Sequence, residues 1–321
     1  MQLHSPTPAH LRWRHHKERS TPFALKLIRW LALHLNREVV RPILWPIVAY
    51  FLLTAGAAVR ASRQFLTRVF GRPATVAQAA RHIHSFAATI LDRVYLISGR
   101  HQMLDVRVYG EEIAQEYGRR GGSLLIGSHL GSFEVLRAIA VNGGSQSGVK
   151  VKMVMRRGHN EMITQLLEAL NPEILQHMID TGDDETENAL KIRDALDQGC
   201  MVSLMGDRAN SETEKTARCR FLGGTAEFPL GWLLLASVMQ VPVLLCFGLY
   251  RGGNRYDIHF ELLAERIHFA RKSREAEAAV WAQRYAGRLE HYAKDAPYNW
   301  FNFYDFWHET APELQPAPAP R

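Results

Sequence analysis

The chain has 321 residues, of which 47% are apolar and 22% charged, a composition that excludes a disordered protein and suits a globular core. The net charge is +7, but the positive excess lies in the first 72 residues and the remainder is close to neutral. Such a basic segment suits anionic lipid headgroups, an acidic carrier protein or nucleic acid. The three cysteines, Cys200, Cys219 and Cys246, match no zinc or redox spacing, which predicts a reduced compartment without disulfides.

The N-terminal part divides into two segments. Residues 1–22 are polar, basic and contain proline, which predicts a flexible arm, and residues 23–72 form the expected membrane-anchor region. Within this region residues 42–59 carry no charge, and as one helix they would extend about 27 Å, just short of the roughly 30 Å hydrocarbon core. Arginines flank both ends. Three arrangements remain open: a spanning helix, a helix lying in the interface, and a buried core helix.

Alternating strand and helix patterns follow, and they define one expected domain at residues 73–311. After a helix at about 75–98, the alternation predicts an α/β fold with a mainly parallel central sheet flanked by helices. The expected strands are 106–110, 123–128, 149–155, 201–205, 241–250 and 256–263, and the expected helices are 132–141, 160–170, 186–198, 229–240 and 273–294. Residues 312–321 are rich in Pro and Ala, which predicts a disordered tail.

The segment GSHLGSFE, residues 127–134, carries the strongest chemical signal. A buried strand is expected to end before His129, Gly131 permits a sharp bend, and Ser132 is a suitable N-cap for the next helix. His129 and Glu134 are five positions apart, so they can meet only if the histidine precedes the helix and the glutamate lies in its first turn. This place, at the carboxyl end of a buried strand, is where α/β proteins bind ligands.

A histidine paired with a carboxylate can act as a general base on an alcohol. The histidine takes the proton of the hydroxyl, an effect of about 10²–10⁴-fold in rate, and the carboxylate fixes its tautomer. His129 would be the base and Glu134 the orienting acid. No serine or cysteine of the protein needs to be acylated, because the hydroxyl of the acceptor attacks directly. Backbone amides at the start of the helix would receive the oxyanion.

Several motifs in the same order resemble the lysophospholipid acyltransferase superfamily, most closely its lipid A late acyltransferases, the lauroyl and myristoyl transferases. The pair His129 and Glu134 resembles the catalytic His-x4-Asp/Glu motif of that superfamily. Other matching segments are VKMVMRR with Arg156, SLMGDRANSE with Asp207, the Phe- and Pro-rich stretch 221–251, and the aromatic run YNWFNFYDFW at 298–307. The resemblance extends from the apolar N-terminal segment to about residue 307.

The resemblance implies a role for each of these positions. It makes His129 and Glu134 catalytic. The guanidinium of Arg156 or Arg157 would bind a phosphate of the acceptor or of the carrier, and Arg156 would also stabilise developing charge. Asp207 and Arg208 would form an ion pair that shapes the site, or would contact the acceptor headgroup. Gly131 and Ser132 would belong to the substrate-binding turn. The aromatic run 298–307 is interpreted mainly as packing or membrane-interface contact.

The sequence also departs from the expected pattern. Ser128 precedes His129 where glycerolipid acyltransferases have Asn, and the later Glu-Gly-Thr block of those enzymes is absent, which favours the lipid A-like branch. The run Gly206-Asp207-Arg208 replaces a more typical Asp-His/Gln-Asp run, so the acceptor can also be another bacterial lipid, such as an aryl polyene or ornithine lipid.

The function expected from this resemblance is transfer of an acyl chain from a carrier thioester to a hydroxyl of a lipid or glycolipid. The donor would be acyl carrier protein or CoA, with no further cofactor and no metal, at the cytoplasmic face of the bacterial inner membrane. A serine hydrolase and a Rossmann dehydrogenase are excluded by missing motifs, and a nucleic-acid binder is disfavoured by the neutral body. An inactive, membrane-bound acyl-binding protein remains the non-enzymatic alternative.

Overall fold

The computed structural model describes Trp30 and residues 37–133, 135, 150–155, 176–209 and 214–307. The predicted arm (1–22), the tail (312–321) and the predicted helix at 160–170 therefore lie outside the described residues, as does most of the predicted helix at 132–141.

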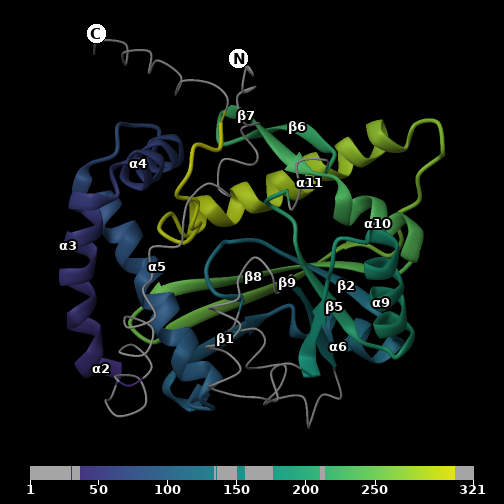
Figure 1. The fold of residues 1–321 in the computed structure, drawn as a ribbon, viewed down its shortest axis with the longest axis horizontal. Helices are drawn as coiled ribbons and strands as arrows, with labels where there is room; N and C mark the ends of the chain where they lie inside the picture. Colours follow the sequence, from purple (N-terminus) through teal and green to yellow (C-terminus); the bar gives the residue numbers. More distant parts are fainter. Residues whose placement is uncertain are drawn as a thin grey trace, which may run out of the picture.

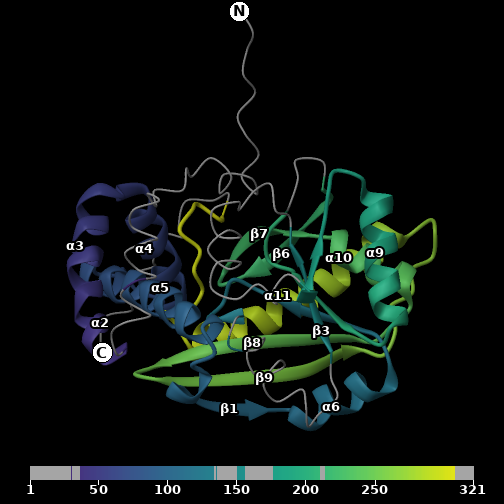
Figure 2. The same ribbon diagram turned by 60° about the horizontal axis from the view of Figure 1, so that its bottom comes forward.

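A central sheet of seven strands, in the order β1-β9-β8-β2-β5-β3-β4, organises the described part of the chain. Strands β8, β2, β5, β3 and β4 run parallel, whereas β9 pairs antiparallel with β8 and parallel with β1. Figure 2 shows this edge of the sheet, with β8, β9 and β1 lying side by side. The strands are β1 (Asp105–Tyr109), β2 (Ser123–Gly127), β3 (Val151–Met155), β4 (Met178–Asp180), β5 (Met201–Met205), β8 (Val243–Gly252) and β9 (Arg255–Ala264). The predicted α/β class and mainly parallel sheet are confirmed.

Both faces of the sheet are covered, because apolar side chains alternate along the central strands to either side. Leu124 and Ile126 of β2 enter one core cluster together with residues of α9, α10 and α11, and Leu125 enters a second cluster with residues of α5 and α6. In Figure 1, α5 lies at the left of the sheet and α9 and α10 at the right. The helices are α5 (Val76–Ile97), α6 (Glu111–Arg120), α9 (Glu185–Asp197), α10 (Gly231–Met239) and α11 (Arg274–Asp295).

A two-stranded hairpin that the sequence analysis did not predict precedes α10. Strands β6 (Thr216–Phe221) and β7 (Gly224–Pro229) pair antiparallel. Leu222 and Gly223 connect them with φ angles of 50° and 74°, the positive values that tight two-residue hairpin turns require. The backbone of Arg220 exchanges hydrogen bonds with the Gln283 side chain, which fastens the hairpin to α11.

The apolar N-terminal segment folds as two helices instead of one. Helix α3 (Leu44–Thr54) ends at Ala55, and α4 (Gly56–Phe70) continues in a different direction, so that the chain bends by 99°. Within the described ranges, no single helix has the length and apolar composition to cross a membrane. The bent pair, counted from Arg37 to Phe70, meets those two criteria as a unit. One straight helix over residues 42–59 is therefore not formed.

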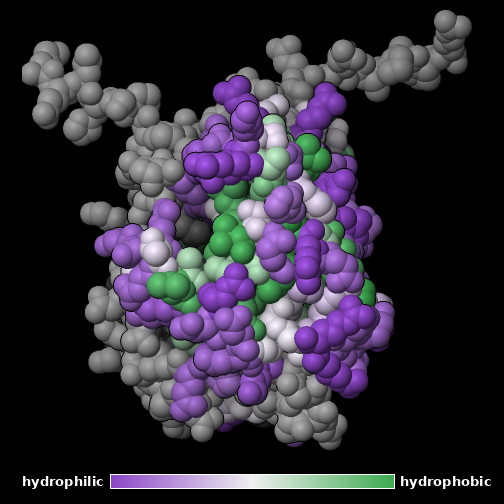
Figure 3. All heavy atoms as spheres, turned by 90° about the vertical axis from the view of Figure 1, so that its right-hand side faces the viewer, coloured by the Kyte–Doolittle hydropathy of each residue, from purple (hydrophilic) through white to green (hydrophobic). Residues whose placement is uncertain are grey.

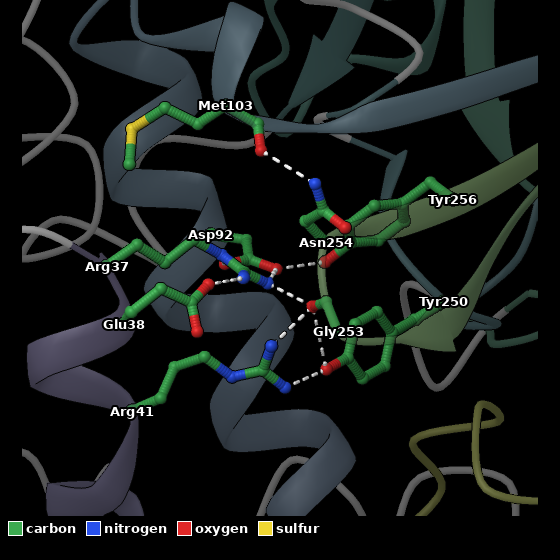
Figure 4. Close-up of polar contacts among 9 residues, drawn as sticks. All are labelled: Arg37, Glu38, Arg41, Asp92, Met103, Tyr250, Gly253, Asn254 and Tyr256. Carbon is green, nitrogen blue, oxygen red and sulfur yellow. Dashed lines mark hydrogen bonds and ion pairs between the residues drawn. The ribbon is translucent and has the colours of Figure 1, made fainter.

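A buried ion pair fastens the start of this N-terminal helical layer to α5, and further hydrogen bonds connect the pair to the sheet (Figure 4). Arg37, in α2 (Arg37–Val40), contacts both carboxylate oxygens of Asp92 of α5, at 2.5 and 2.9 Å. The Tyr256 hydroxyl of β9 donates to the same carboxylate at 2.7 Å, and both Arg37 and Arg41 donate to the carbonyl of Gly253. The layer is thus attached at the turn between β8 and β9.

Replacing Asp92 by alanine is expected to lower the free energy of unfolding by about 3–5 kcal/mol, because the buried guanidinium of Arg37 loses its counter-charge. Glu38→Ala is the matched control, since Glu38 also pairs with Arg37 but its side chain is 78% exposed, and its loss is expected to cost about 0–1 kcal/mol. Urea unfolding of the two variants measures the difference. Equal stabilities would contradict a structural role for the buried pair.

Candidate active site

The predicted catalytic turn follows the buried central strand β2 and packs directly against β8. Gly131 has a φ of 72°, and a Cβ atom placed there would lie 1.8 Å from the carbonyl oxygen of Gly248. Gly131 is therefore required for close approach of two backbones. Its amide donates to the carbonyl of Asn299, and the Ser132 amide donates to the carbonyl of Gly248, each at 2.8 Å.

These two hydrogen bonds show what the backbone of Gly131 and Ser132 does in the fold. Protein carbonyls already accept from both N–H groups, so the two amides hold the shape of the turn that carries His129. The substrate-binding role expected for Gly131 and Ser132 stays a prediction.

His129 is paired with Asp207, which lies just beyond the end of β5. The imidazole Nδ1 lies 2.8 Å from Oδ1 of Asp207, and the backbone amide of His129 donates to Oδ2 at 3.0 Å. The His129 side chain is 36% exposed, whereas that of Asp207 is fully buried. Nε2 has no hydrogen-bond partner among the residues that the structure describes. The geometry presents one ring nitrogen outward and fixes the other on a carboxylate.

The charges around this pair keep the carboxylate ionised and the imidazole neutral at pH 7. Burial alone would raise the pKa of Asp207, but His129 and Arg208 together with the hydrogen bonds from His129 hold that pKa well below its usual value. Burial and then the positive charge of Arg208 lower the pKa of His129, against the opposing effect of Asp207. Since a carboxylate only accepts hydrogen bonds, the proton of neutral His129 belongs on Nδ1, which leaves Nε2 unprotonated and able to accept a proton.

The carboxylate expected beside the imidazole was Glu134, five residues along the chain. Asp207 instead occupies Nδ1, although the sequence indicated for it a contact with Arg208 or with the acceptor headgroup. Glu134 and Arg156 lie outside the described residues, so their predicted roles stay predictions. Arg208 lies close to the pair, where one of its nitrogens donates to the carbonyl of Phe301 at 2.7 Å.

The C-terminal segment Asn299–Phe301 holds the turn that carries His129 in place. Its backbone accepts from Gly131 and donates from Phe301 to the carbonyl of His129 at 2.9 Å. The Asn299 side chain accepts from the amide of Tyr250 at 2.6 Å and donates to the carbonyl of that residue at 3.0 Å, which joins the segment to β8. Trp300 donates its indole N–H to Oδ2 of Asp207 at 3.1 Å.

Sequence reasoning missed these supporting residues. The run 298–307 was interpreted mainly as packing or membrane contact, yet Asn299 and Trp300 hydrogen-bond to the site. Two further buried groups support it: Tyr285 of α11 donates to the carbonyl of Gly127 at 2.8 Å, and His82 of α5 bonds the carbonyl of Trp300 at 2.9 Å. Among these residues, the sequence analysis included only Asn299 and Trp300, as members of the aromatic run YNWFNFYDFW.

In the part of the chain that the structure describes, no group of three or more His, Cys, Asp or Glu side chains is arranged to hold a metal ion. Comparison of the chain with protein-family models and with curated proteins found no match. The chemistry of the site therefore has to be inferred from its own residues.

Replacing Asp207 by asparagine is expected to reverse the tautomer of His129. The amide NH₂ of asparagine donates where the carboxylate accepted, so Nδ1 becomes the acceptor and the proton moves to Nε2. Nitrogen-15 NMR of labelled histidine distinguishes the two tautomers, and His129→Gln identifies the signal. Asp197→Asn, at an exposed position of α9, is the control and should leave the signal unchanged. An unaltered tautomer in Asp207→Asn would show that Asp207 does not orient the ring.

Proposed function

We propose that this protein is a membrane-bound acyltransferase that moves an acyl chain from a carrier thioester to a hydroxyl of a lipid or glycolipid. The observation that carries the proposal is the pair formed by half-exposed His129 and buried, ionised Asp207 at the carboxyl ends of β2 and β5. The donor is acyl carrier protein or CoA. The acceptor class follows from the resemblance to lipid A late acyltransferases, and an aryl polyene or ornithine lipid is the alternative acceptor.

The reaction balances without an acyl-enzyme intermediate. The acceptor oxygen attacks the thioester carbonyl while Nε2 of His129 takes the hydroxyl proton. The carbon–sulfur bond then breaks, the imidazolium returns the proton to the leaving sulfur, and an ester and a free carrier thiol result. Asp207 keeps the proton of the neutral ring on Nδ1 and stabilises the imidazolium. Arg208 adds positive charge close to the ring.

The cysteines support direct transfer in preference to a cysteine acyl-enzyme. Cys200, Cys219 and Cys246 are all buried. Burial raises the pKa of Cys219 to about 11 and that of Cys246 well above its ordinary value, so neither supplies a thiolate at neutral pH.

We place the protein at the cytoplasmic face of the bacterial inner membrane, and the outer surface of α3 supports this placement. Between residues 39 and 91 the sequence has six arginines and no acid. Large apolar side chains on α3 are exposed, including Leu53 at 87% and Tyr50 at 59%. Aromatic and aliphatic side chains beside arginines are typical of helices that lie in a membrane interface with anionic lipid. The bend at Ala55 favours this arrangement over a straight spanning helix.

His129→Ala is expected to abolish transfer while the protein still folds, because the ring is partly exposed and lies outside the main core. Lipid mass spectrometry on a strain that lacks the protein, complemented with wild type or variant, is the measurement. Wild type should restore one acylated lipid whose mass identifies chain and acceptor. His291→Ala, at an exposed position of α11, is the control and should also restore it. Full restoration by His129→Ala would favour the inactive acyl-binding alternative.

Replacing both Tyr50 and Leu53 by glutamine is expected to weaken binding to vesicles that contain anionic phospholipid by about tenfold or more, since each side chain contributes apolar burial. Leu190→Gln together with Val238→Gln is the matched control. These two residues are 60% and 67% exposed on α9 and α10, at the opposite end of the molecule, where hydrophilic residues surround a small apolar area (Figure 3). Vesicle co-sedimentation compares the two pairs, and equal losses would rule out α3 as the membrane-facing surface.

A further inference from the structure

The Asp207 carboxylate receives hydrogen bonds from two separate parts of the chain. Oδ1 faces Nδ1 of His129, while Oδ2 accepts from the His129 backbone amide at 3.0 Å and from the Trp300 indole at 3.1 Å. The indole bond is the only one of the three that comes from outside the catalytic turn. It uses lone pairs of Oδ2 and leaves Oδ1 directed at the imidazole.

The indole of Trp300 is held rigidly. Trp300 is fully buried, and its ring makes edge contacts with Phe65, Phe221 and Phe306 at centroid distances of 5.2, 5.1 and 4.8 Å. Its backbone bridges antiparallel to Leu130, in the same turn as His129. The indole N–H therefore has no freedom to follow the carboxylate, so the carboxylate is held to the indole.

A buried histidine fixes the backbone of Trp300 from the other side. His82 lies with Nε2 at 2.9 Å from the carbonyl of Trp300 and Nδ1 at 2.9 Å from the Ser62 hydroxyl. Burial lowers the pKa of His82 to about 4, so the ring is neutral at pH 7. Because a carbonyl only accepts, the single proton of His82 lies on Nε2, and Nδ1 accepts from Ser62.

We propose that Trp300 is a positioning residue whose indole N–H fixes the Asp207 carboxylate and weakens the attraction of that carboxylate for the His129 imidazolium. His129 then releases a proton as readily as it takes one. The inference rests on the proposed function, in which His129 is the base. A carboxylate shared among three N–H donors attracts the imidazolium less than one shared between two. Trp300 therefore tunes the base without touching the substrate.

The other charged and titratable groups near the ring act in fixed directions. Arg208 lowers the pKa of His129, and the hydroxyl groups of Tyr285 and Tyr304 stay protonated because burial raises their pKa values. None of these groups bonds to the indole of Trp300 among the described contacts. Removing the indole N–H should therefore change only the strength of the interaction between the Asp207 carboxylate and His129.

Trp300→Phe tests this, since it deletes the N–H and keeps an aromatic ring in the cavity. We expect the pKa of His129, followed by nitrogen-15 NMR titration, to rise by about 0.5 to 1 pH unit because Asp207 loses one of three donors. The acidic limb of the kcat/KM profile should move by the same amount toward higher pH, because the base must be neutral to accept a proton.

Trp307→Phe is the matched control. Trp307 is 1% exposed, packs on the same Phe221 ring, and donates its indole N–H at 3.0 Å to the carbonyl of Phe221, away from Asp207. It should leave the pKa of His129 unchanged. If Trp300→Phe does not fold, benzothienylalanine at position 300 keeps the shape of the indole and replaces the N–H by sulfur.

An unchanged or lowered pKa of His129 after loss of the Trp300 N–H, or an equal rise in the Trp307 control, would overturn the proposal. The NMR titration needs no turnover, so it stays informative if the acyltransferase assignment fails. A raised pKa with no acyl transfer by the wild type would refute only the proposed function. Transfer by the wild type with an unchanged pKa would refute only the role of Trp300.

Discussion

The buried carboxylate of Asp207 is the constraint on which the arrangement of the site depends. A fully buried charge is tolerated only where several donors surround it, and here the donors come from the turn after β2 and from the C-terminal segment. Both segments must therefore converge beyond the end of β5. The 299–301 segment also bonds to β8 through Asn299, so one short stretch connects three parts of the site.

The register of the sheet brings His129 and Asp207 together although 78 residues separate them. Gly127 of β2 pairs with Met205 of β5, and each of the two site residues lies two positions beyond its paired residue. Parallel neighbours end at the same edge, so two polar residues at equal distance past their strands become adjacent. The amide of Gly206 donates to the carbonyl of Gly127 at 3.0 Å and extends the contact toward the pair.

Features that depend on local sequence were predicted, whereas features that depend on strand pairing or on unusual backbone angles were not. The buried strands and His129 were predicted because apolar runs and a strand-turn-helix pattern are local signals. The sequence pointed to Glu134 as a partner of His129 because nearby spacing is visible in a sequence. It did not point to Asp207 as a partner of Nδ1, because the pairing of β2 with β5 is not visible there. The β6–β7 hairpin was missed because its turn places Leu222 at a positive φ, which apolar residues rarely adopt. The break at Ala55 lies between Thr54 and Gly56, two residues that weaken a helix, but their presence does not reveal the direction of the bend.

Hydrogen bonds also join the N-terminal helical layer to the turn that carries His129. Arg41, one turn before α3, donates to the Tyr250 hydroxyl, and the backbone of Tyr250 is held by Asn299, whose carbonyl accepts from Gly131. The apolar surface of α3 and the turn that carries His129 therefore have fixed positions relative to a single residue of β8. Under the proposed function, α3 would lie on the membrane and His129 would be the base, and the enzyme would need a constant distance between the two. Attachment of both to the end of one central strand supplies that distance without a separate domain.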